Sequence, residues 1–304
     1  MYIPFGFKLS IIFIIKDLIY RSTIQLLRFH FSYFLMPVYW FALSFVENIY
    51  LPRAILVFII LHLLVYPSSN GYNSFMDRDA DSIGGLKNPL QPTRQLFVTS
   101  IFMDVIAIAL SLFISTLFAV CVSIYIICSR LYSYRGVRLK QYPLLGYVTV
   151  ILNQGALTFF MVCHSSDIYL TNHVSWLGLL SSSFLIGGFY PITQVYQHET
   201  DKNDNVTTIS MIMGKKGTFI FCGIMYLVAM IILWLYYQTR ELYTPFIVLL
   251  VCFFPVVIYF IQWFLQVLKN ENKADFKHTM QMNWLASTCT SLAFITIILL
   301  NKFG

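Results

Sequence analysis

The sequence predicts an all-α, polytopic membrane protein. Of its 304 residues, 58% are hydrophobic and only 11% are charged, and the mean hydropathy is +0.72. Water-soluble domains have about 25% charged residues, so this composition excludes a water-soluble enzyme. It also excludes a disordered segment and a collagen-like fibre.

Nine apolar stretches are long enough to cross a bilayer, which takes about 20 residues at about 1.5 Å per residue. The stretch from Leu96 to Ser129 would be about 50 Å long as one helix, whereas the hydrocarbon core is about 30 Å thick. We therefore expect it to fold back at Ser115 and Thr116. The expected spans are residues 31–51, 54–75, 96–114, 116–134, 143–163, 174–194, 217–237, 243–267 and 283–301.

The basic residues predict the orientation of these spans. With the N-terminus in the cytoplasm, 17 of the 20 Lys and Arg residues fall on the cytoplasmic side, as the positive-inside rule requires. The C-terminus then lies outside. This asymmetry explains the net charge of +7 without a nucleic-acid partner. The cytoplasmic segments are residues 1–30, 76–95, 130–142, 195–216 and 268–282.

The chain is expected to consist of an N-terminal segment, residues 1–30, and a single transmembrane domain, residues 31–304. The N-terminal segment makes a poor signal peptide, because its apolar stretch Leu9–Ile15 is short and ends at Lys16. An amphipathic helix in the cytoplasmic interface is the better prediction. No linker or low-complexity segment divides the remainder.

The first acidic segment, Asn70–Asp81, follows the second span. Asn73, Asp77 and Asp81 are spaced four residues apart, so on a helix their side chains would share one stripe. Oxygen ligands on one face suit Mg²⁺, which takes its other ligands from water and substrate phosphate. On such a helix Asp79 would point away, toward solvent.

The second acidic segment, Gln197–Asn205, follows the sixth span. Gln197 and Asp201 are four residues apart, and Asp204 follows three residues later. Acidic loop residues are commonly just solvated. Two acidic segments that directly continue spans at the same membrane face, beside basic loops, instead indicate a site for a metal and a phosphorylated substrate.

These two segments resemble the Asp-rich motifs of the UbiA superfamily of intramembrane prenyltransferases. The first motif, N-D-x-x-D-x-x-x-D, corresponds to Asn73–Asp81, and the second, which begins D-x-x-x-D, corresponds to Gln197–Thr208. The resemblance extends over residues 25–301. It implies nine transmembrane helices in a bundle around a central cavity, with cytoplasmic loops that cap the cavity.

The sequence departs from these motifs at several positions. Ser74 replaces the first Asp, and Asn88 stands where an Arg usually follows the first motif. Gln197 replaces the Asp that opens the second motif; its carbonyl oxygen can bind a cation but carries no charge. Glu199 or Asp204 could supply the missing carboxylate.

The resemblance implies Mg²⁺-dependent transfer of a prenyl group from an allylic polyprenyl diphosphate to an aromatic or lipid acceptor within the membrane. Aromatic faces would stabilise the allylic cation. The implied catalytic residues are Asp77, Asp81 and Asp201; the implied Mg²⁺ ligands are Asn73, Asp77, Asp81, Gln197, Asp201 and Asp204; and the implied diphosphate-binding residues are Lys140, Arg138, Lys87 and Arg94.

Four further residues are weaker candidates for the acceptor or prenyl pocket, namely Asn153, Asp104, Tyr190 and Tyr196. Asp104 lies mid-span, where a charge is costly, so it is either protonated and hydrogen-bonded within the bundle or part of the pocket. Asn153 either binds the acceptor or joins helices. Alternative functions are a transporter or cation-binding protein, and a UbiA-like protein whose catalysis Gln197 impairs.

Overall fold

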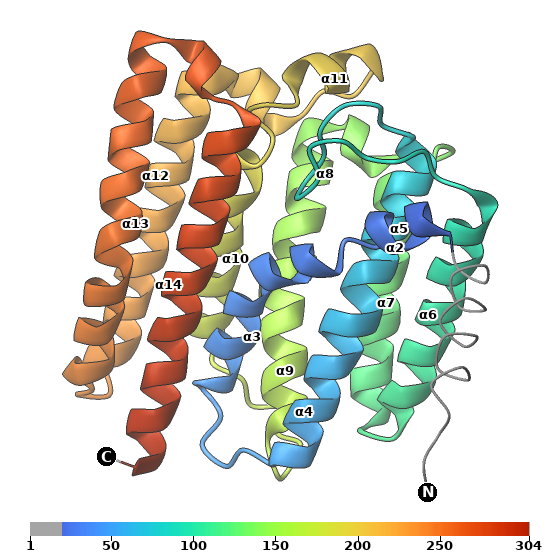
Figure 1. Ribbon diagram of the computed structural model, residues 1–304. Helices are drawn as coiled ribbons and strands as arrows, with labels where there is room; N and C mark the ends of the chain where they lie inside the picture. Colours follow the sequence, from blue (N-terminus) through green and yellow to red (C-terminus); the bar gives the residue numbers. More distant parts are fainter. Residues whose placement is uncertain (1–19, 304) are drawn as a thin grey trace, which may run out of the picture.

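The computed structural model describes residues 20–303, and every regular element among them is a helix (Figure 1). Seven of these helices are long and apolar enough to cross a membrane, and α10 (Trp176–Ile192) is a shorter apolar helix. The prediction of an all-α polytopic membrane protein is confirmed.

Several predicted spans are single elements and others contain a π-helix. The chain begins with α2 (Arg21–Leu26), the 3-10 helix η1 (Phe29–Leu35) and α3 (Met36–Leu43). Two spans are composite: α4 (Leu51–Ile59), η2 (Ile60–Val65) and α5 (Tyr66–Asp77), then α8 (Pro143–Val150), η4 (Ile151–Leu157) and α9 (Thr158–Ser166). The rest are α6 (Arg94–Leu112), α7 (Thr116–Ser133), η3 (Leu139–Gln141), α10, α11 (His198–Asn203), α12 (Ile209–Gln238), α13 (Tyr243–Lys269), η5 (Glu271–Lys273) and α14 (Phe276–Phe303).

The first predicted span is where the structure differs most from the expectation. Instead of one helix over residues 31–51, the chain forms η1 and the short α3, which ends at Leu43. The count of nine spanning helices is therefore not confirmed. The predicted interfacial helix falls mainly on residues 1–19, outside the described residues, and α2 is the helix that follows them.

The long apolar stretch after residue 95 folds back where predicted. Helix α6 ends at Leu112, and α7 begins at Thr116. The Ser115 hydroxyl caps α7 by accepting a hydrogen bond from the backbone N–H of Phe118 at 3.0 Å. Serine is a favoured N-cap because its oxygen satisfies a helical N–H that has no partner within the helix.

Small residues allow α10 to pack closely against two neighbouring helices. A Cβ on Gly155 of η4 would lie 2.7 Å from the Cα of Ser183, and one on Gly188 would lie 3.1 Å from the Cys222 carbonyl oxygen of α12. Helices in lipid gain stability from such close van der Waals packing, because the lipid removes most of the hydrophobic driving force. Helix α10 is thus held centrally, between η4 and α12.

Replacing Gly155 with Ala is expected to destabilise the protein by about 1–3 kcal/mol, because the new methyl group would collide with backbone rather than with a movable side chain. Thermal unfolding in detergent measures this. Gly223→Ala is the matched control, since its Cβ would meet only Phe260 at 3.8 Å and Ala favours a helix. Equal stabilities of the two variants would contradict the close contact.

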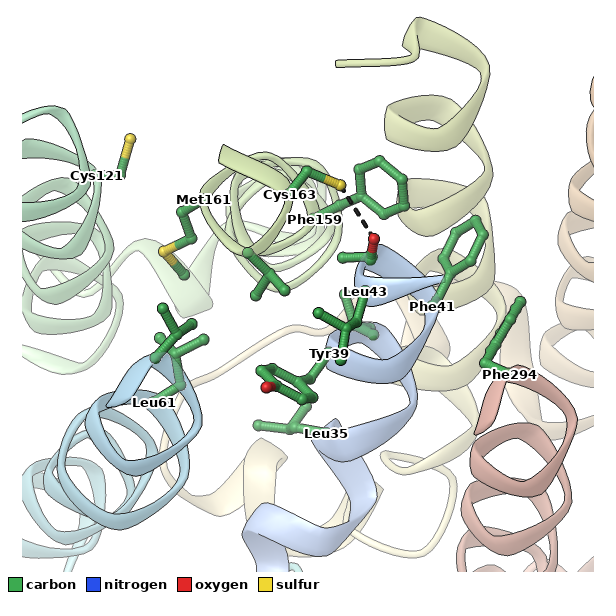
Figure 2. Packing of buried hydrophobic residues seen from close by; sticks show 14 of the residues in the cluster. Leu35, Tyr39, Phe41, Leu43, Leu61, Cys121, Phe159, Met161, Cys163 and Phe294 are labelled. Atoms are coloured by element: carbon green, nitrogen blue, oxygen red, sulfur yellow. Dashed lines mark hydrogen bonds between the residues drawn. The ribbon is translucent and has the colours of Figure 1, made fainter. Parts of the chain in front are cut away.

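Aromatic stacking joins helices that are far apart in the sequence (Figure 2). Phe41 of α3 stacks on Phe294 of α14 with ring centroids 4.6 Å apart, and its ring lies 4.8 Å from that of Phe159 of α9. The Cys163 thiol donates a hydrogen bond to the Ala42 carbonyl at 3.2 Å. All six cysteines are free thiols. Helix α3 is therefore packed against both α9 and α14, the last helix of the chain.

The two acidic segments and the basic loop between α7 and α8 gather at one end of the bundle, and the C-terminus lies at the opposite end (Figure 1). This arrangement agrees with the relative sidedness that the basic residues predict. Which end faces the cytoplasm stays a prediction, as does the division at residue 30.

Candidate active site

A cavity of about 220 Å³ lies at the end of the bundle that carries both acidic segments. Helices α5, α7, α8, α10 and α11, the 3-10 helices η1 and η3, the π-helix η4 and the adjoining loops line it. Of the predicted metal ligands, those that line it are Asn73, Asp77, Gln197 and Asp201. The fold therefore brings residues 120 or so apart in sequence to one cavity.

Asp77, the last residue of α5, is the centre of the polar contacts. Its carboxylate accepts a hydrogen bond from Lys140 Nζ at 2.5 Å and forms an ion pair with Arg138 at 3.6 Å. Only 4% of its side chain is exposed. Both cations come from the loop between α7 and α8, so the pairing ties this loop to α5.

Asn73 lies one turn before Asp77 on the same face of α5. Its amide nitrogen donates to Asp77 Oδ2 at 2.9 Å and to the Ser133 hydroxyl at 3.0 Å. Both bonds use the amide nitrogen, so the amide oxygen is left for a ligand. The helical spacing predicted this pair correctly.

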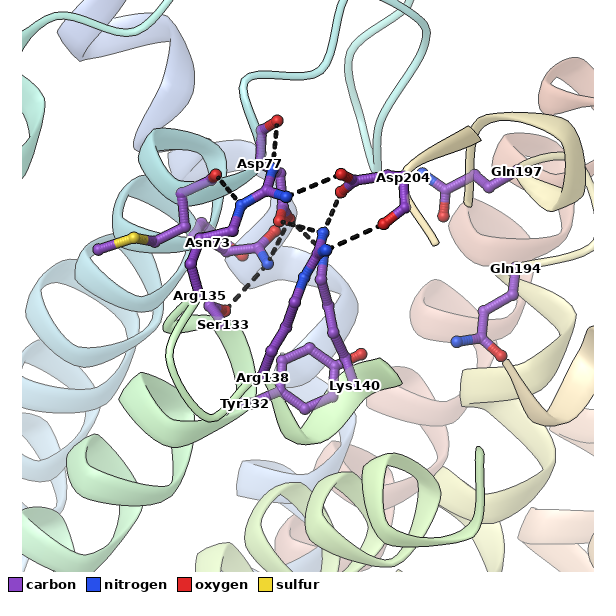
Figure 3. Close-up of polar contacts among 12 residues, drawn as sticks. Asn73, Asp77, Tyr132, Ser133, Arg135, Arg138, Lys140, Gln194, Gln197 and Asp204 are labelled. Atoms are coloured by element: carbon purple, nitrogen blue, oxygen red, sulfur yellow. Dashed lines mark hydrogen bonds and ion pairs between the residues drawn. The ribbon is translucent and has the colours of Figure 1, made fainter. Parts of the chain in front are cut away.

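The basic loop also holds the second acidic segment (Figure 3). Arg138 donates to the backbone and the carboxylate of Asp204, and Arg135 donates to the same carboxylate at 2.8 Å. Arg135 also donates to the Met76 carbonyl at 2.8 Å. Burial alone would raise the pKa of Asp204, but the hydrogen bonds from these arginines lower it. Asp204 therefore joins loops and does not line the cavity, contrary to its expected role as a metal ligand.

The expected stripe of three oxygen ligands is wrong in its third member. Helix α5 ends at Asp77 because Arg78 adopts a left-handed backbone with φ of 55°. The chain therefore turns, and Asp79 lines the cavity instead of facing solvent. Asp81 is exposed, and its carboxylate accepts a hydrogen bond from the Thr200 hydroxyl at 3.0 Å.

Burial, together with neighbouring carboxylates, raises the pKa of two acids in the cavity, Asp79 and Asp201. Burial raises the pKa of Asp79 to about 6, and Asp77 adds to this rise. Burial likewise raises the pKa of Asp201 to about 7, against the lowering effect of Lys140 and with contributions from Asp79 and Asp77. Buried carboxylates that share a site disfavour their charged forms unless a cation compensates them.

Two glutamines line the cavity beside Asp201. The Gln197 amide nitrogen donates a long hydrogen bond to the Ser82 carbonyl at 3.4 Å, so Gln197 also contacts the loop that follows the first acidic segment. Gln194 is 6% exposed, and its amide nitrogen donates to the Tyr190 hydroxyl at 2.8 Å. Gln194 is a cavity residue that the sequence pattern did not single out.

The cations at the cavity differ from the predicted set. Lys87 and Arg94 are exposed and do not line the cavity. Arg28 lines it instead, and it is 6% exposed. Its guanidinium donates to the Gly84 carbonyl at 3.2 Å and to the Asn70 carbonyl at 3.4 Å. Its left-handed φ of 48° between α2 and η1 has no signature in the sequence.

Of the four weaker candidates, Asn153, Tyr190 and Tyr196 line the cavity and Asp104 does not. Asp104 forms an ion pair with Arg130 of α7 and accepts a hydrogen bond from the Ser68 hydroxyl at 2.6 Å. It is therefore satisfied within the bundle, and it is paired with a cation rather than merely hydrogen-bonded.

The donor set fits a hard divalent cation in its chemistry. Within residues 20–303, no three His, Cys, Asp or Glu side chains are close enough together to hold one metal ion. The cavity nevertheless offers carboxylate oxygens from Asp77, Asp79 and Asp201 and amide oxygens from Asn73 and Gln197, which are the ligand types that Mg²⁺ prefers. Asp77 Oδ1 is buried and has no hydrogen-bond donor. This oxygen faces Arg138 in an ion pair at 3.6 Å.

Comparison with known protein families shows to which family the chain belongs. The sequence profile of the UbiA prenyltransferase family matches residues 34–286. The chain belongs to the UbiA prenyltransferase family. The match includes both acidic segments and the basic loop, although no curated protein matches the sequence.

Solved structures agree with this UbiA assignment. A UbiA homologue from Archaeoglobus fulgidus bound to GPP and Mg²⁺ has a TM-score of 0.66 at 18% identity, covering 91% of this chain and 99% of that chain. A UbiA homologue from Aeropyrum pernix K1 in its apo form has a TM-score of 0.68 at 17% identity, covering 90% and 98%. A digeranylgeranylglyceryl phosphate synthase has a TM-score of 0.59 at 20% identity, covering 91% and 98%. At these identities the likeness establishes the UbiA fold.

Proposed function

We propose that this protein transfers a prenyl group from an allylic diphosphate to a hydrophobic acceptor within the membrane, with Mg²⁺ as its cofactor. One observation carries the proposal: the charged cavity adjoins an apolar cavity of about 330 Å³, and Phe189 lines both. Helices α3, α10, α12, α13 and α14 surround the apolar cavity. A charged chamber beside an apolar one fits a substrate with an anionic head and a hydrocarbon chain.

The residues of the charged cavity take distinct roles in this proposal. Asp77, Asp79, Asp201, Asn73 and Gln197 would hold Mg²⁺. When bound, the metal would supply positive charge that stabilises the departing diphosphate.

Lys140 and Arg28 would bind the diphosphate oxygens directly and favour their increasing negative charge. The allylic C–O bond breaks with both electrons on the diphosphate, the acceptor forms the new bond to the allylic carbon, and the acceptor then loses a proton. The UbiA homologue bound to GPP and Mg²⁺ supports this choice of ligands.

A transporter is less consistent with the distribution of charge. Transporters place their ion sites near the bilayer midplane. Here the charged residues of the cavity lie in or beside the loops at one end of the bundle, and the deep Asp104 is paired with Arg130. A protein with impaired catalysis remains the main alternative, because Gln197 adds no charge to the metal ligands.

The proposal predicts diphosphate release that depends on Mg²⁺. The purified protein would be incubated with radiolabelled allylic diphosphates of several chain lengths, with a membrane lipid extract as acceptor pool, with and without EDTA. We expect a labelled prenylated product with Mg²⁺ and none with EDTA. The absence of product from every donor would contradict the proposal.

Asp79→Asn and Asp81→Asn form a matched pair in this assay. Asp79 lines the cavity, whereas Asp81 is exposed outside it. We therefore expect Asp79→Asn to reduce the rate about tenfold more than Asp81→Asn, because only Asp79 would contribute to the metal site. The reverse order would favour the helical stripe that the sequence spacing predicts.

A further inference from the structure

A separate polar cavity of about 310 Å³ lies at the end of the bundle opposite the charged cavity. The loop after α3, the end of α9, the loop that leads to α10 and the end of α12 line it. The charged cavity lies at the other ends of α10 and α12, beside α11 (Figure 1). The proposed prenyl transfer gives this second cavity no role.

The carboxylate of Asp167 lines this cavity and is buried, with 7% of the residue exposed. Its Oδ1 accepts a hydrogen bond from the backbone N–H of Tyr169 at 2.8 Å. The guanidinium of Arg53 donates to the Asp167 backbone carbonyl and not to the carboxylate. Among residues 20–303 no cation pairs with Asp167, and its Oδ2 accepts no hydrogen bond. Because buried charges are normally paired, this oxygen calls for a positively charged donor.

Backbone hydrogen bonds on both sides of Asp167 hold this carboxylate in place. The N–H of Ile168 donates to the Asn48 carbonyl at 2.9 Å, and the N–H of Tyr50 donates to the Ser166 carbonyl at 2.8 Å. The two loops that line the cavity are thereby joined. A group that is already positioned loses little conformational entropy when a ligand binds.

Two further charged side chains line the same cavity, namely Glu47 and Arg240. The guanidinium of Arg240 lies over the ring of Tyr236, 4.7 Å from its centroid. Within the described part of the chain, neither charged group has an ion pair. Guanidinium groups bind phosphate well, and carboxylates bind ammonium groups. Because Arg240 would repel a bare metal ion, the combination fits a ligand that carries both an ammonium and a phosphate.

The residues around this cavity place it at the level of the lipid head groups. Four aromatic side chains at this end of the bundle are exposed: Tyr50, Tyr169, Trp176 and Tyr243. Tyrosine and tryptophan collect where a bilayer meets water. Trp176 directly follows Ser175, which lines the cavity. A phospholipid can therefore reach the cavity with its head group while its chains stay in the bilayer.

We propose that this cavity binds the head group of a phospholipid that carries a primary ammonium, as in phosphatidylethanolamine. The ammonium donates hydrogen bonds to Asp167 and Glu47, and the phosphate accepts them from Arg240. A quaternary ammonium has no N–H to give to Asp167 Oδ2. This inference goes beyond the proposed function and does not depend on it.

Dioctanoyl-phosphatidylethanolamine and dioctanoyl-phosphatidylcholine test the proposal, because they share their chains and phosphate and differ in the methylation of the ammonium. Each is titrated into the purified full-length protein in detergent, and bound lipid is counted by native mass spectrometry. We expect Kd for the ethanolamine lipid to be about tenfold lower, since only its ammonium donates hydrogen bonds to the buried carboxylate. Equal affinities would overturn the proposal.

Asp167→Asn is expected to raise Kd for the ethanolamine lipid about tenfold and to leave Kd for the choline lipid unchanged. The amide oxygen of the variant can still accept the hydrogen bond from Tyr169, so the loop keeps its shape. Glu241→Gln is the matched control, because Glu241 is exposed beside Arg240 and does not line the cavity. It should leave both affinities unchanged. A variant Asp167→Asn that keeps the preference of the wild type would contradict the site.

Arg240→Gln should weaken both lipids to the same extent, about tenfold, because it removes the partner of the phosphate they share. Loss of affinity for the ethanolamine lipid alone would contradict this role of Arg240. Glu47→Gln repeats the test of the ammonium contact at an exposed residue, where the fold does not depend on the side chain. It should reduce the preference for the ethanolamine lipid, and an unchanged preference would count against the contact.

Soluble O-phosphoethanolamine distinguishes a lipid from a free metabolite with the same charged groups. It lacks acyl chains, whose burial contributes about 0.8 kcal/mol per CH₂ group, so we expect it to compete with the ethanolamine lipid only at concentrations at least about a hundredfold higher. Competition at equal concentrations would show that the occupant is not a lipid.

Discussion

Asp77→Asn is expected to lower the rate of diphosphate release about 100- to 1,000-fold, the loss typical of removing one group that stabilises charge in a transition state. Its carboxylate is the shared partner of Lys140 and Arg138 and lies on the cavity wall. An amide of the same shape brings no charge to Mg²⁺ and leaves Lys140 without its counter-charge, whereas Arg138 still pairs with Asp204. Release of labelled diphosphate at saturating substrate measures the effect.

A purely structural role for Asp77 predicts a different result. If Asp77 served only to neutralise Lys140, then Asp77→Asn/Lys140→Met would be as stable and as active as Lys140→Met alone. We expect the double variant to match Lys140→Met in thermal stability but to be much less active than it. Glu271→Gln is the control for an acid-to-amide change at the same end of the bundle, because Glu271 is exposed and pairs with Lys216 at 3.2 Å. Activity of Asp77→Asn within fivefold of wild type would contradict a catalytic role.

Asp104→Leu is expected to reduce the free energy of unfolding by about 3–5 kcal/mol, because it leaves Arg130 charged and unpaired inside the bundle. Asp104 is 6% exposed, and it accepts hydrogen bonds from Arg130 and Ser68. The guanidinium also lies over the Tyr72 ring, 4.2 Å from its centroid. Denaturation in detergent, followed by the loss of helical circular dichroism, measures the change.

The double variant Asp104→Leu/Arg130→Met tests whether the loss of stability comes from breaking the ion pair between Asp104 and Arg130. Replacing both charges with apolar side chains of similar volume removes the unpaired charge, so most of the lost stability should return. KM for substrates should stay near that of wild type in the double variant, since neither residue lines the cavity. A double variant as unstable as Asp104→Leu would show that Asp104 acts through other contacts.

Apolar length and charge distribution were enough to predict the membrane class and most spans. The hairpin at Ser115 was predictable because a helix of about 50 Å is far longer than the hydrocarbon core of about 30 Å, and a serine there caps the next helix. The break in the first predicted span was not predictable, because the residues of η1 and α3 are as apolar as those of a continuous helix. Their shape is set by packing against α9 and α14.

Spacing on a helix predicts side-chain positions only while the helix continues. It placed Asn73 and Asp77 correctly, but failed at Asp79 and Asp81 because Arg78 takes a left-handed conformation that arginine rarely adopts. Arg28 could not be predicted at all, since its place in the cavity depends on how the N-terminal segment crosses α5. Contacts between distant loops leave no local pattern in the sequence.

The pairing of Lys140 and Arg138 with Asp77 has a consequence for how ligands bind. Because Arg138 also pairs with Asp204, two cations face two carboxylates, and their charges balance at the mouth of the cavity. An anion that took Lys140 would strip a buried carboxylate of its counter-ion, and a cation that took the carboxylate would strip Lys140. Binding of the anion to Lys140 costs less free energy once a cation has bound Asp77, and binding of the cation costs less once the anion has bound. The anion and the cation should therefore increase each other's affinity by the same factor.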